Sequence, residues 1–258
     1  MRRRFFVERF DTNSATLLGE TAEHLGRVLR AEPGQLYELS DGRSVWLGRV
    51  ERVALSKRGD SRIEFALVEP IAAREPRVRT TLLVALVKFD RFEWCLEKAT
   101  EMGVNEIVPL AAARSDKPLI AAAEKRSARW EKILLESSQQ SRRLRPPILR
   151  FAATREHGQG KANAMATPGA AFSECAGGCK IILSERADAP SIRDALKRAE
   201  DFREQSAVLA IGPEGGWTDE ELESARAREF AEVSLGENIL RTETAVIAAM
   251  AMVGFALG

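Results

Sequence analysis

Short apolar runs alternate with segments of helical length from about residue 73 to the end of the chain. A continuous apolar run suits a strand that is buried on both faces, and a following helix covers one of those faces. Strands are expected at 81–87, 107–110, 181–183, 207–211 and 232–235, and helices at 92–102, 124–143 and 191–202, with a last helix from Thr242. This alternation predicts an α/β fold built on a mostly parallel sheet.

Residues 1–72 follow a different pattern, in which short strands are separated by turn signals. Strands are expected at 5–7, 35–39, 45–50 and 63–68, with one helical turn at 22–30. The stretch 69–76 contains Pro70 and Pro76 and is interpreted as a linker. We therefore expect two domains, a small β-rich barrel or sandwich over 1–72 and the α/β domain over 73–258.

Composition excludes several classes of protein. The balance of 45% hydrophobic and 30% charged residues is that of a globular protein. Charged residues from Glu8 onward interrupt the N-terminus before a signal peptide could form, and the apolar stretch 245–257 is shorter than the roughly 18 residues of a membrane span. Three cysteines and two histidines make a poor set of metal ligands. We expect a cytoplasmic protein without a metal or a membrane contact.

Positive charge is concentrated in one segment, although the net charge of the chain is only +1. The basic residues of this segment are Lys125, Arg126, Arg129, Lys132, Arg142, Arg143, Arg145 and Arg150, against the acidic Glu131 and Glu136. Such a segment is either a solvated helix face or a surface for a polyanion such as RNA, and the charges alone favour neither.

Two glycine-containing segments, 211–218 and 235–245, each follow an expected strand and precede a helix. Open α/β sheets bind ligands at the carboxyl ends of their strands, so both segments are candidates for a binding site. The first segment lacks the lysine of a phosphate-binding loop and the glycine spacing of a dinucleotide fold. Glycine at 212, 215 and 216 would allow left-handed backbone conformations and a close approach of the main chain to a ligand. An ordinary turn is the competing interpretation.

Read as motifs, GPEGGWTDEE (212–221) and LGENILRTETA (235–245) resemble the bacterial 16S ribosomal RNA uridine-N3 methyltransferases of the SPOUT superfamily. Other parts resemble the same family: Phe5 with the preceding arginines, HLGRVLR (24–30), KATEMGV (98–104) and QSRR (140–143) before Pro146. The resemblance therefore covers nearly the whole chain. It implies a PUA-like RNA-binding β-barrel followed by a SPOUT domain, in which a mostly parallel sheet carries a C-terminal trefoil knot.

The resemblance also implies S-adenosylmethionine as the cofactor, bound in a pocket that three loops form. The corresponding residues are Leu183, Ser184, Glu185, Ile211, Gly212, Pro213, Glu214, Gly215, Gly216, Leu235, Gly236, Ile239, Leu240 and Arg241. Main-chain groups would recognise the adenine, and the apolar side chains would form the walls. The last helix would pack in a homodimer whose partner completes the active site.

Methylation of uracil N3 requires that the N3 proton be removed and that the resulting negative charge be stabilised. We expect Arg241 to stabilise the uracil anion, with Glu243 or Glu214 as the proton acceptor or an orienting group. The alternative for Arg241 and Glu243 is a buried ion pair that holds the knot.

The expected partner is 16S ribosomal RNA in the assembled small subunit, bound through its shape and its phosphates. The residues expected to contact RNA are Arg2, Arg3, Arg4, Arg9, His24, Arg27, Arg30, Arg142 and Arg143. His24 is interpreted as a hydrogen-bonding histidine and not as a catalyst. Three other functions compete: a SPOUT enzyme that acts on the ribose 2′-oxygen or another base, a catalytically silent RNA-binding protein, and a nucleotide-dependent enzyme.

Overall fold

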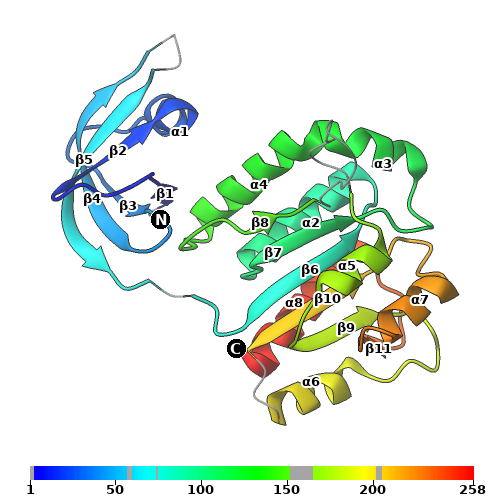
Figure 1. The fold of residues 1–258 in the computed structure, drawn as a ribbon. Helices are drawn as coiled ribbons and strands as arrows, with labels where there is room; N and C mark the ends of the chain where they lie inside the picture. The colour runs from blue at the N-terminus through cyan, green and yellow to red at the C-terminus, as the bar shows by residue number, and fades with distance from the viewer. Residues whose placement is uncertain (1–2, 57–59, 74, 152–164, 202–204) are drawn as a thin grey trace. The chain divides into compact units, whose positions relative to one another are not determined.

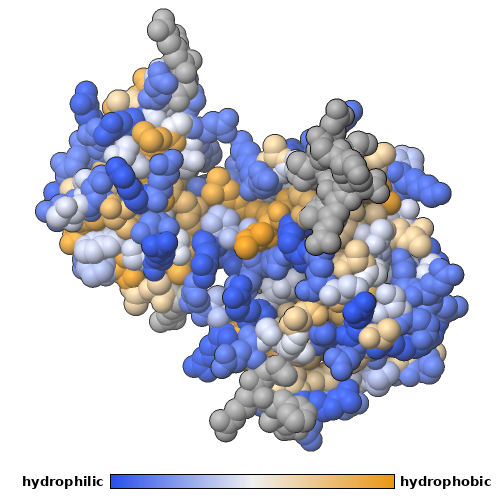
Figure 2. Space-filling view, viewed as in Figure 1, coloured by the Kyte–Doolittle hydropathy of each residue, from blue (hydrophilic) through white to orange (hydrophobic). Residues whose placement is uncertain are grey.

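The computed structural model describes residues 3–56, 60–73, 75–151, 165–201 and 205–258, so Arg2 lies outside it. The chain divides into two compact units. Unit 1 comprises Met1–Glu75 and Ser138–Pro146, and unit 2 comprises Pro76–Ser137 and Pro147–Gly258. The first stretch of unit 1 resembles the expected first domain, but the return of 138–146 to it was not expected. Figure 2 shows polar residues over much of the visible face of each unit, with apolar ones among them.

Unit 1 is built on a curled five-stranded sheet with the order β1-β3-β4-β5-β2 (Figure 1). Its elements are β1 (Arg4–Phe6), β2 (Ser14–Leu18), α1 (Gly19–Glu23), the π-helical turn η1 (His24–Val28), β3 (Leu36–Ser40), β4 (Val45–Ala54) and β5 (Arg62–Ile71). β1 runs parallel to β3, and the other pairs are antiparallel. The sequence did not indicate β2. The linker was expected to begin at residue 69, and this prediction was wrong, because Pro70 lies within β5 and pairs with Trp46.

The core of unit 1 contains the fully buried side chains of Phe5, Leu39, Ile63 and Phe65. Gly48 makes this packing possible, because a Cβ atom there would lie 2.5 Å from a methyl group of Leu39. The pairing of β4 with β5 shifts register at the same glycine, which bends the sheet.

The returning segment 138–146 is fixed to unit 1 by buried contacts. The Ser40 hydroxyl donates to the carbonyl oxygen of Leu144 over 2.6 Å, and the Leu144 side chain is itself buried. Arg145 forms an ion pair of 2.7 Å with Glu75. Arg142 adopts a positive φ of 55° after the helix has ended at Gln140, three residues before the expected end at 143.

Unit 2 confirms the predicted α/β fold. Its six-stranded sheet has the order β11-β9-β10-β6-β7-β8, and every pair of neighbouring strands is parallel. The strands are β6 (Arg79–Ala85), β7 (Glu106–Leu110), β8 (Ile148–Leu149), β9 (Cys179–Leu183), β10 (Ser206–Ile211) and β11 (Ala231–Val233). Neighbouring residues on these strands point to opposite faces, so Leu82 and Leu83 enter different hydrophobic clusters.

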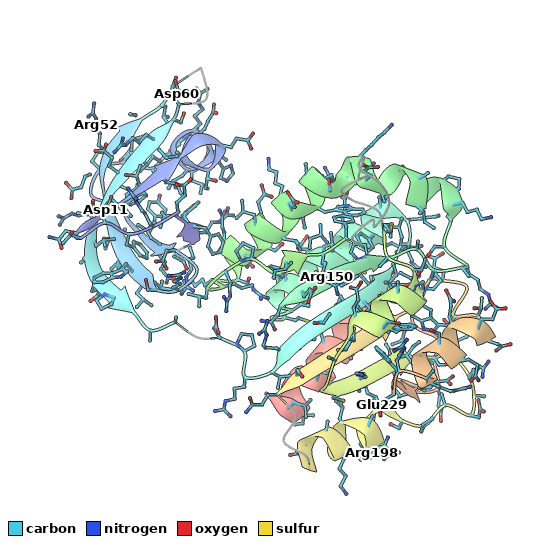
Figure 3. All side chains as sticks on the ribbon, in the orientation of Figure 1. Asp11, Arg52, Asp60, Arg150, Arg198 and Glu229 are labelled. Atoms are coloured by element: carbon cyan, nitrogen blue, oxygen red, sulfur yellow. The ribbon has the colours of Figure 1, made fainter. Side chains whose placement is uncertain are left out.

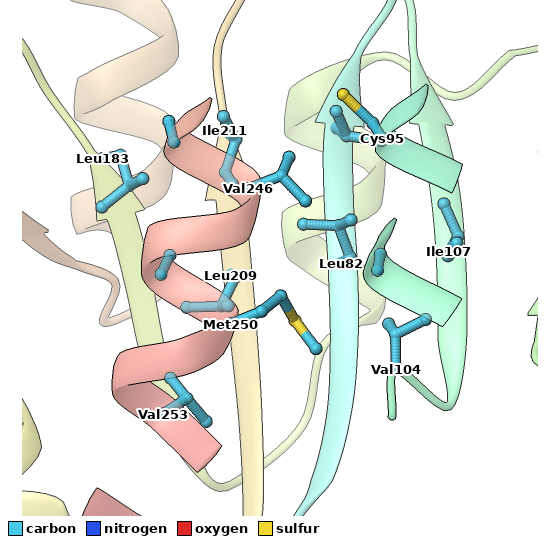
Figure 4. Packing of buried hydrophobic residues seen from close by; sticks show 14 of the residues in the cluster. Leu82, Cys95, Val104, Ile107, Leu183, Leu209, Ile211, Val246, Met250 and Val253 are labelled. Carbon is cyan, nitrogen blue, oxygen red and sulfur yellow. The ribbon is translucent and has the colours of Figure 1, made fainter. Parts of the chain in front are cut away.

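Helices cover both faces of this sheet. The helical elements are α2 (Phe89–Glu101), α3 (Lys117–Ala123), the 3-10 turn η2 (Glu124–Arg126), α4 (Ser127–Gln140), α5 (Pro168–Glu174), α6 (Ile192–Asp201), α7 (Asp219–Arg226) and α8 (Thr242–Leu257). Residues of α2, α4, α6 and α8 share one cluster with the sheet, whereas α5 and α7 pack on the other face. Figure 4 shows Val246 and Met250 of α8 extending over β10 toward β6. Two of the helices on this face, α2 and α8, are neighbours.

Candidate functional site

Three loops meet at one edge of the unit 2 sheet. They follow β9, β10 and β11, which are adjacent and parallel, so their carboxyl ends lie side by side. Together with residues of α2 and of the loop after β7, these loops line a cavity of about 1120 Å³. The residues that sequence reasoning assigned to the cofactor all line this cavity: Leu183, Ser184, Glu185, Ile211, Gly212, Pro213, Glu214, Gly215, Gly216, Leu235, Gly236, Ile239, Leu240 and Arg241.

Hydrogen bonds hold the three loops to one another. The Trp217 indole donates to the carbonyl oxygen of Leu183 over 2.9 Å, which joins the loop after β10 to the end of β9. The Thr242 hydroxyl donates to the carbonyl oxygen of Gly212 over 3.2 Å, which joins the start of α8 to the loop after β10. Because these bonds fix the loops independently of any ligand, the cavity is largely preformed.

Glycine is needed at different positions of these loops for different structural reasons. Gly216 has φ +69° and Gly236 has φ +143°, conformations that side chains other than glycine rarely adopt. Gly212 and Gly215 do not have the expected left-handed conformation. At Gly212 the constraint is contact, since a Cβ atom would lie 3.1 Å from the Trp217 ring.

A capping box starts α7 directly after the second loop. The Thr218 hydroxyl accepts from the Glu221 amide over 3.2 Å, and the Glu221 carboxylate accepts from the Thr218 amide over 2.9 Å. The other oxygen of Glu221 accepts from the Ala113 amide over 2.8 Å, which ties the loop after β7 to this helix.

The three catalytic candidates occupy different positions. Glu214 and Arg241 both line the cavity, and each is exposed. Glu243 is only 7% exposed and does not line the cavity, because it lies in the first turn of α8 and packs beneath α2. The ion pair that involves Glu243 is formed with Arg91, 3.9 Å away, and not with Arg241.

Sequence reasoning missed three arginines that line the cavity, Arg91, Arg114 and Arg186. Arg91, in the first turn of α2, also forms an ion pair with Glu214. Arg114 donates to the carbonyl oxygen of Gly215 over 2.7 Å. Arg91 follows β6, which is the neighbour of β10 in the sheet, and Arg114 follows β7, the next strand beyond β6. Both strands are distant from β10 in sequence, so only the strand order could have indicated these two arginines.

The described residues expected to bind RNA all belong to unit 1, including Arg142 and Arg143, which had been assigned to the second domain. Arg3, Arg9, Arg27 and Arg30 are exposed. His24 is partly exposed, in η1.

Arg4 differs from the expectation, because it is 5% exposed and its guanidinium donates twice to the Glu38 carboxylate, over 2.9 and 3.1 Å. Arg142 also approaches Glu38, at 3.5 Å. Burial, together with the charge of Arg145, lowers the pKa of Arg143 to about 10. Because Glu38 holds its guanidinium, Arg4 cannot reach a phosphate in this conformation.

Local partners compensate several charges of the basic segment 125–150. Arg129 donates to both oxygens of Glu93 over 2.8 Å, and Arg126 lies 4.5 Å above the Phe89 ring. Arg150, which is labelled in Figure 3, is paired with Glu106 and Glu174. Within unit 2 the solvated-face interpretation therefore accounts for these arginines.

Two further findings concern metal sites and membrane-spanning helices. Among the described residues, no group of His, Cys, Asp and Glu side chains is arranged to hold a metal ion. Within the described ranges, none of the helices combines the length and the apolarity that a membrane crossing demands.

Comparison with known proteins identifies the family. Residues 74–254 match a family model described as an RNA methyltransferase domain. The ribosomal RNA small subunit methyltransferase E of Synechocystis is 32% identical over 246 residues, which cover 93% of this chain and 72% of that protein. The Mycobacterium bovis protein of the same name is 29% identical, and the match covers 97% of this chain and 90% of that protein.

Solved structures agree with this result. The small subunit methyltransferase E of Neisseria gonorrhoeae, bound to S-adenosylmethionine, has a TM-score of 0.82 and 28% identity, covering 99% of this chain and 98% of that one. A Legionella pneumophila methyltransferase in complex with the same cofactor has a TM-score of 0.80 and 26% identity, with the same coverage. The chain therefore belongs to the family of ribosomal RNA small subunit methyltransferases E.

Proposed function

We propose that this protein transfers the methyl group of S-adenosylmethionine to N3 of a uridine in 16S ribosomal RNA. The observation that carries the proposal is that the loops after β9, β10 and β11 line one shared cavity. The exposed carboxylate of Glu214 and the exposed guanidinium of Arg241 both line this cavity. Two relatives of known structure bind S-adenosylmethionine, and the named relatives are methyltransferases of the small ribosomal subunit.

The residues of the cavity fit this cofactor. Leu183, Ile211, Leu235 and Leu240 provide apolar walls, and the glycine-containing loops bring main-chain amides and carbonyls to the surface of the cavity. A cavity of about 1120 Å³ is slightly larger than most small-molecule sites, so it has room for the cofactor and for part of an acceptor base. When bound, S-adenosylmethionine supplies a methyl group made electrophilic by its sulfonium sulfur.

The protein must then remove the N3 proton and stabilise the charge that this leaves on the uracil. We assign proton acceptance to Glu214, whose carboxylate lines the cavity. Arg241 lies at the N-cap of α8 on the same cavity and would hold the negative charge shared by O2, N3 and O4 of the ring. Glu243 is assigned no contact with the base, because it lies behind the cavity wall.

Uracil N3 lies on the base-pairing edge, so the uridine must be unpaired or rotated out of its stack before it can react. The exposed arginines of unit 1, Arg3, Arg9, Arg27 and Arg30, would hold the surrounding RNA by its phosphates. We propose the assembled small subunit as the substrate, which places the enzyme in the cytoplasm. Arg4 has no part in this contact, because Glu38 occupies its guanidinium.

We further propose that the enzyme is a homodimer that associates through α8. The part of this helix that faces away from the sheet remains apolar, with Met252 39% and Phe255 93% exposed. An exposed apolar helix face is typical of an interface. We also propose that unit 1 is a PUA-like barrel, and that the segment leading into α8 passes through a loop of unit 2 to form a trefoil knot, a rare topology.

Nucleoside mass spectrometry tests the reaction. Small subunits from cells that lack this protein should lose one 3-methyluridine, and purified enzyme with S-adenosylmethionine should restore it. Restoration of a 2′-O-methylated nucleoside would instead support the related SPOUT activity. Binding of RNA without any restored methyl group, and without calorimetric heat on addition of S-adenosylmethionine, would support a silent RNA-binding protein.

A further inference from the structure

Arg91 connects two carboxylates that come from distant parts of the chain. Its guanidinium is paired with Glu214, in the loop after β10, and its Nε lies 3.9 Å from an oxygen of Glu243, in the first turn of α8. The Arg91 side chain is 25% exposed, so most of it is enclosed while its end reaches the cavity. A planar guanidinium with several donors suits such a bridge better than an ammonium group, which can replace it only in part.

Glu243 is buried on the far side of this bridge. The residue is 7% exposed, and its Oε2 has no hydrogen-bond partner among the described residues. Burial of a carboxylate is costly unless a cation is near, and Arg91 provides that cation from α2. The position of Glu243 in the first turn of α8 adds the favourable effect of the helix dipole.

A buried cysteine of α2 lies near Arg91 and Glu243. Cys95 lies one helical turn after Arg91 and is buried against β6, as Figure 4 shows. Burial, and the nearby charge of Glu243, raise the pKa of the Cys95 thiol to about 12. Glu214 differs, because its side chain is 49% exposed and lies on a loop, between Pro213 and Gly215.

We propose that Arg91 is a positioning residue, which is anchored by Glu243 and orients the Glu214 carboxylate toward the acceptor base. The inference rests on the proposed function, since it assumes that Glu214 accepts the N3 proton. Without this bridge the exposed Glu214 side chain would populate several rotamers, and few of them would place an oxygen within hydrogen-bond reach of N3. A structural role for Arg91, limited to joining α2 and α8, is the competing interpretation.

Kinetics of four variants separate the two interpretations. The variants are Arg91→Ala, Arg91→Lys, Glu214→Gln and the double variant with Arg91→Ala and Glu214→Gln, each assayed as the full chain with unmethylated small subunits and labelled S-adenosylmethionine. Arg91→Ala should lower kcat about 100-fold, the scale expected when a reacting group is misplaced. The dissociation constant of S-adenosylmethionine should change less than about three-fold, because Arg91 acts through Glu214. Arg91→Lys should recover part of kcat.

The double variant gives the sharpest result. If Arg91 acts through Glu214, Arg91→Ala should cause no further loss of kcat in the Glu214→Gln background. Arg129→Ala is the matched control, because Arg129 also forms an ion pair with α2, through Glu93, but does not line the cavity. It should leave kcat unchanged.

Distinct outcomes would overturn the inference or its foundation. Additive losses in the double variant would assign Arg91 a structural role. The same conclusion would follow if the Arg91→Lys protein showed no more activity, and no higher thermal stability, than the Arg91→Ala protein. Full activity of Arg91→Ala would also overturn the inference. If Arg91→Ala does not fold, Glu243→Gln replaces it, with the same non-additivity expected toward Glu214→Gln. A wild-type protein that methylates no uridine would overturn the proposed function itself.

Discussion

Trp217 holds the cavity together through one hydrogen bond, and its replacement by phenylalanine measures that contribution. The residue is 7% exposed, and its indole donates to the Leu183 carbonyl over 2.9 Å. Trp217→Phe keeps an aromatic ring but leaves the carbonyl without this donor, which costs about 1–3 kcal/mol when no water can replace it. We therefore expect the free energy of unfolding to fall by about 2 kcal/mol.

The same bond joins the ends of β9 and β10, so its loss should also loosen the cofactor loops. If the lost hydrogen bond also weakens cofactor binding by about 1.4 kcal/mol, the dissociation constant of S-adenosylmethionine rises about ten-fold. Urea unfolding followed by far-ultraviolet circular dichroism measures the first quantity, and calorimetric titration measures the second. Neither method depends on the fluorescence of the replaced indole.

Trp94→Phe is the control, since Trp94 is 45% exposed on α2 and does not line the cavity. Its stability should change by less than about 0.5 kcal/mol, as is usual for surface substitutions. A Trp217→Phe protein as stable as this control, with unchanged cofactor affinity, would refute the reasoning that this bond fixes the loops.

Four other predictions use the same assays and two simple additions. Gly236→Ala forces a side chain onto a backbone with φ +143°, which costs about 1–3 kcal/mol, so cofactor affinity should fall; unchanged affinity would remove this loop from the site. Arg241→Ala should lower turnover more than cofactor affinity, and full activity would contradict its role in holding the uracil anion. Replacement of both Arg27 and Arg30 by alanine should weaken RNA binding and reduce the slope of log K against log salt by about 2, whereas an unchanged slope would exclude both from phosphate contact. The Cys95 thiol, with its pKa raised to about 12, should resist alkylation at pH 8 until the protein is unfolded; rapid reaction of the native protein would contradict its burial.

The α/β unit could be predicted from the sequence because its strands are short apolar runs and its helices have clear periodicity. The elements that were missed are short or lack such a signal: β8 has two residues, and α5 has seven, although Thr167 and Pro168 provide a cap and a first-turn proline. In unit 1, β2 alternates small and apolar residues too briefly to stand out.

The cavity could be indicated from the sequence as far as its residues lie in local motifs. Its three loops could be indicated because each is a continuous segment at the end of a strand. Arg91 and Arg114 were missed because their places depend on β6 lying beside β10 and β7 lying beside β6, which are long-range pairings. The burial of Arg4 has the same cause, because it depends on the register that sets Arg4 opposite Glu38 on β3.

The return of residues 138–146 to unit 1 has a consequence for biosynthesis. This unit cannot be completed when residue 75 leaves the ribosome, because the carbonyl that Ser40 requires belongs to Leu144. The N-terminal sheet must wait, with part of its surface uncovered, until much of the next unit has been translated. A fragment cut at residue 75 would keep that defect permanently, and a shortened version of this protein should therefore retain the chain at least through Pro146.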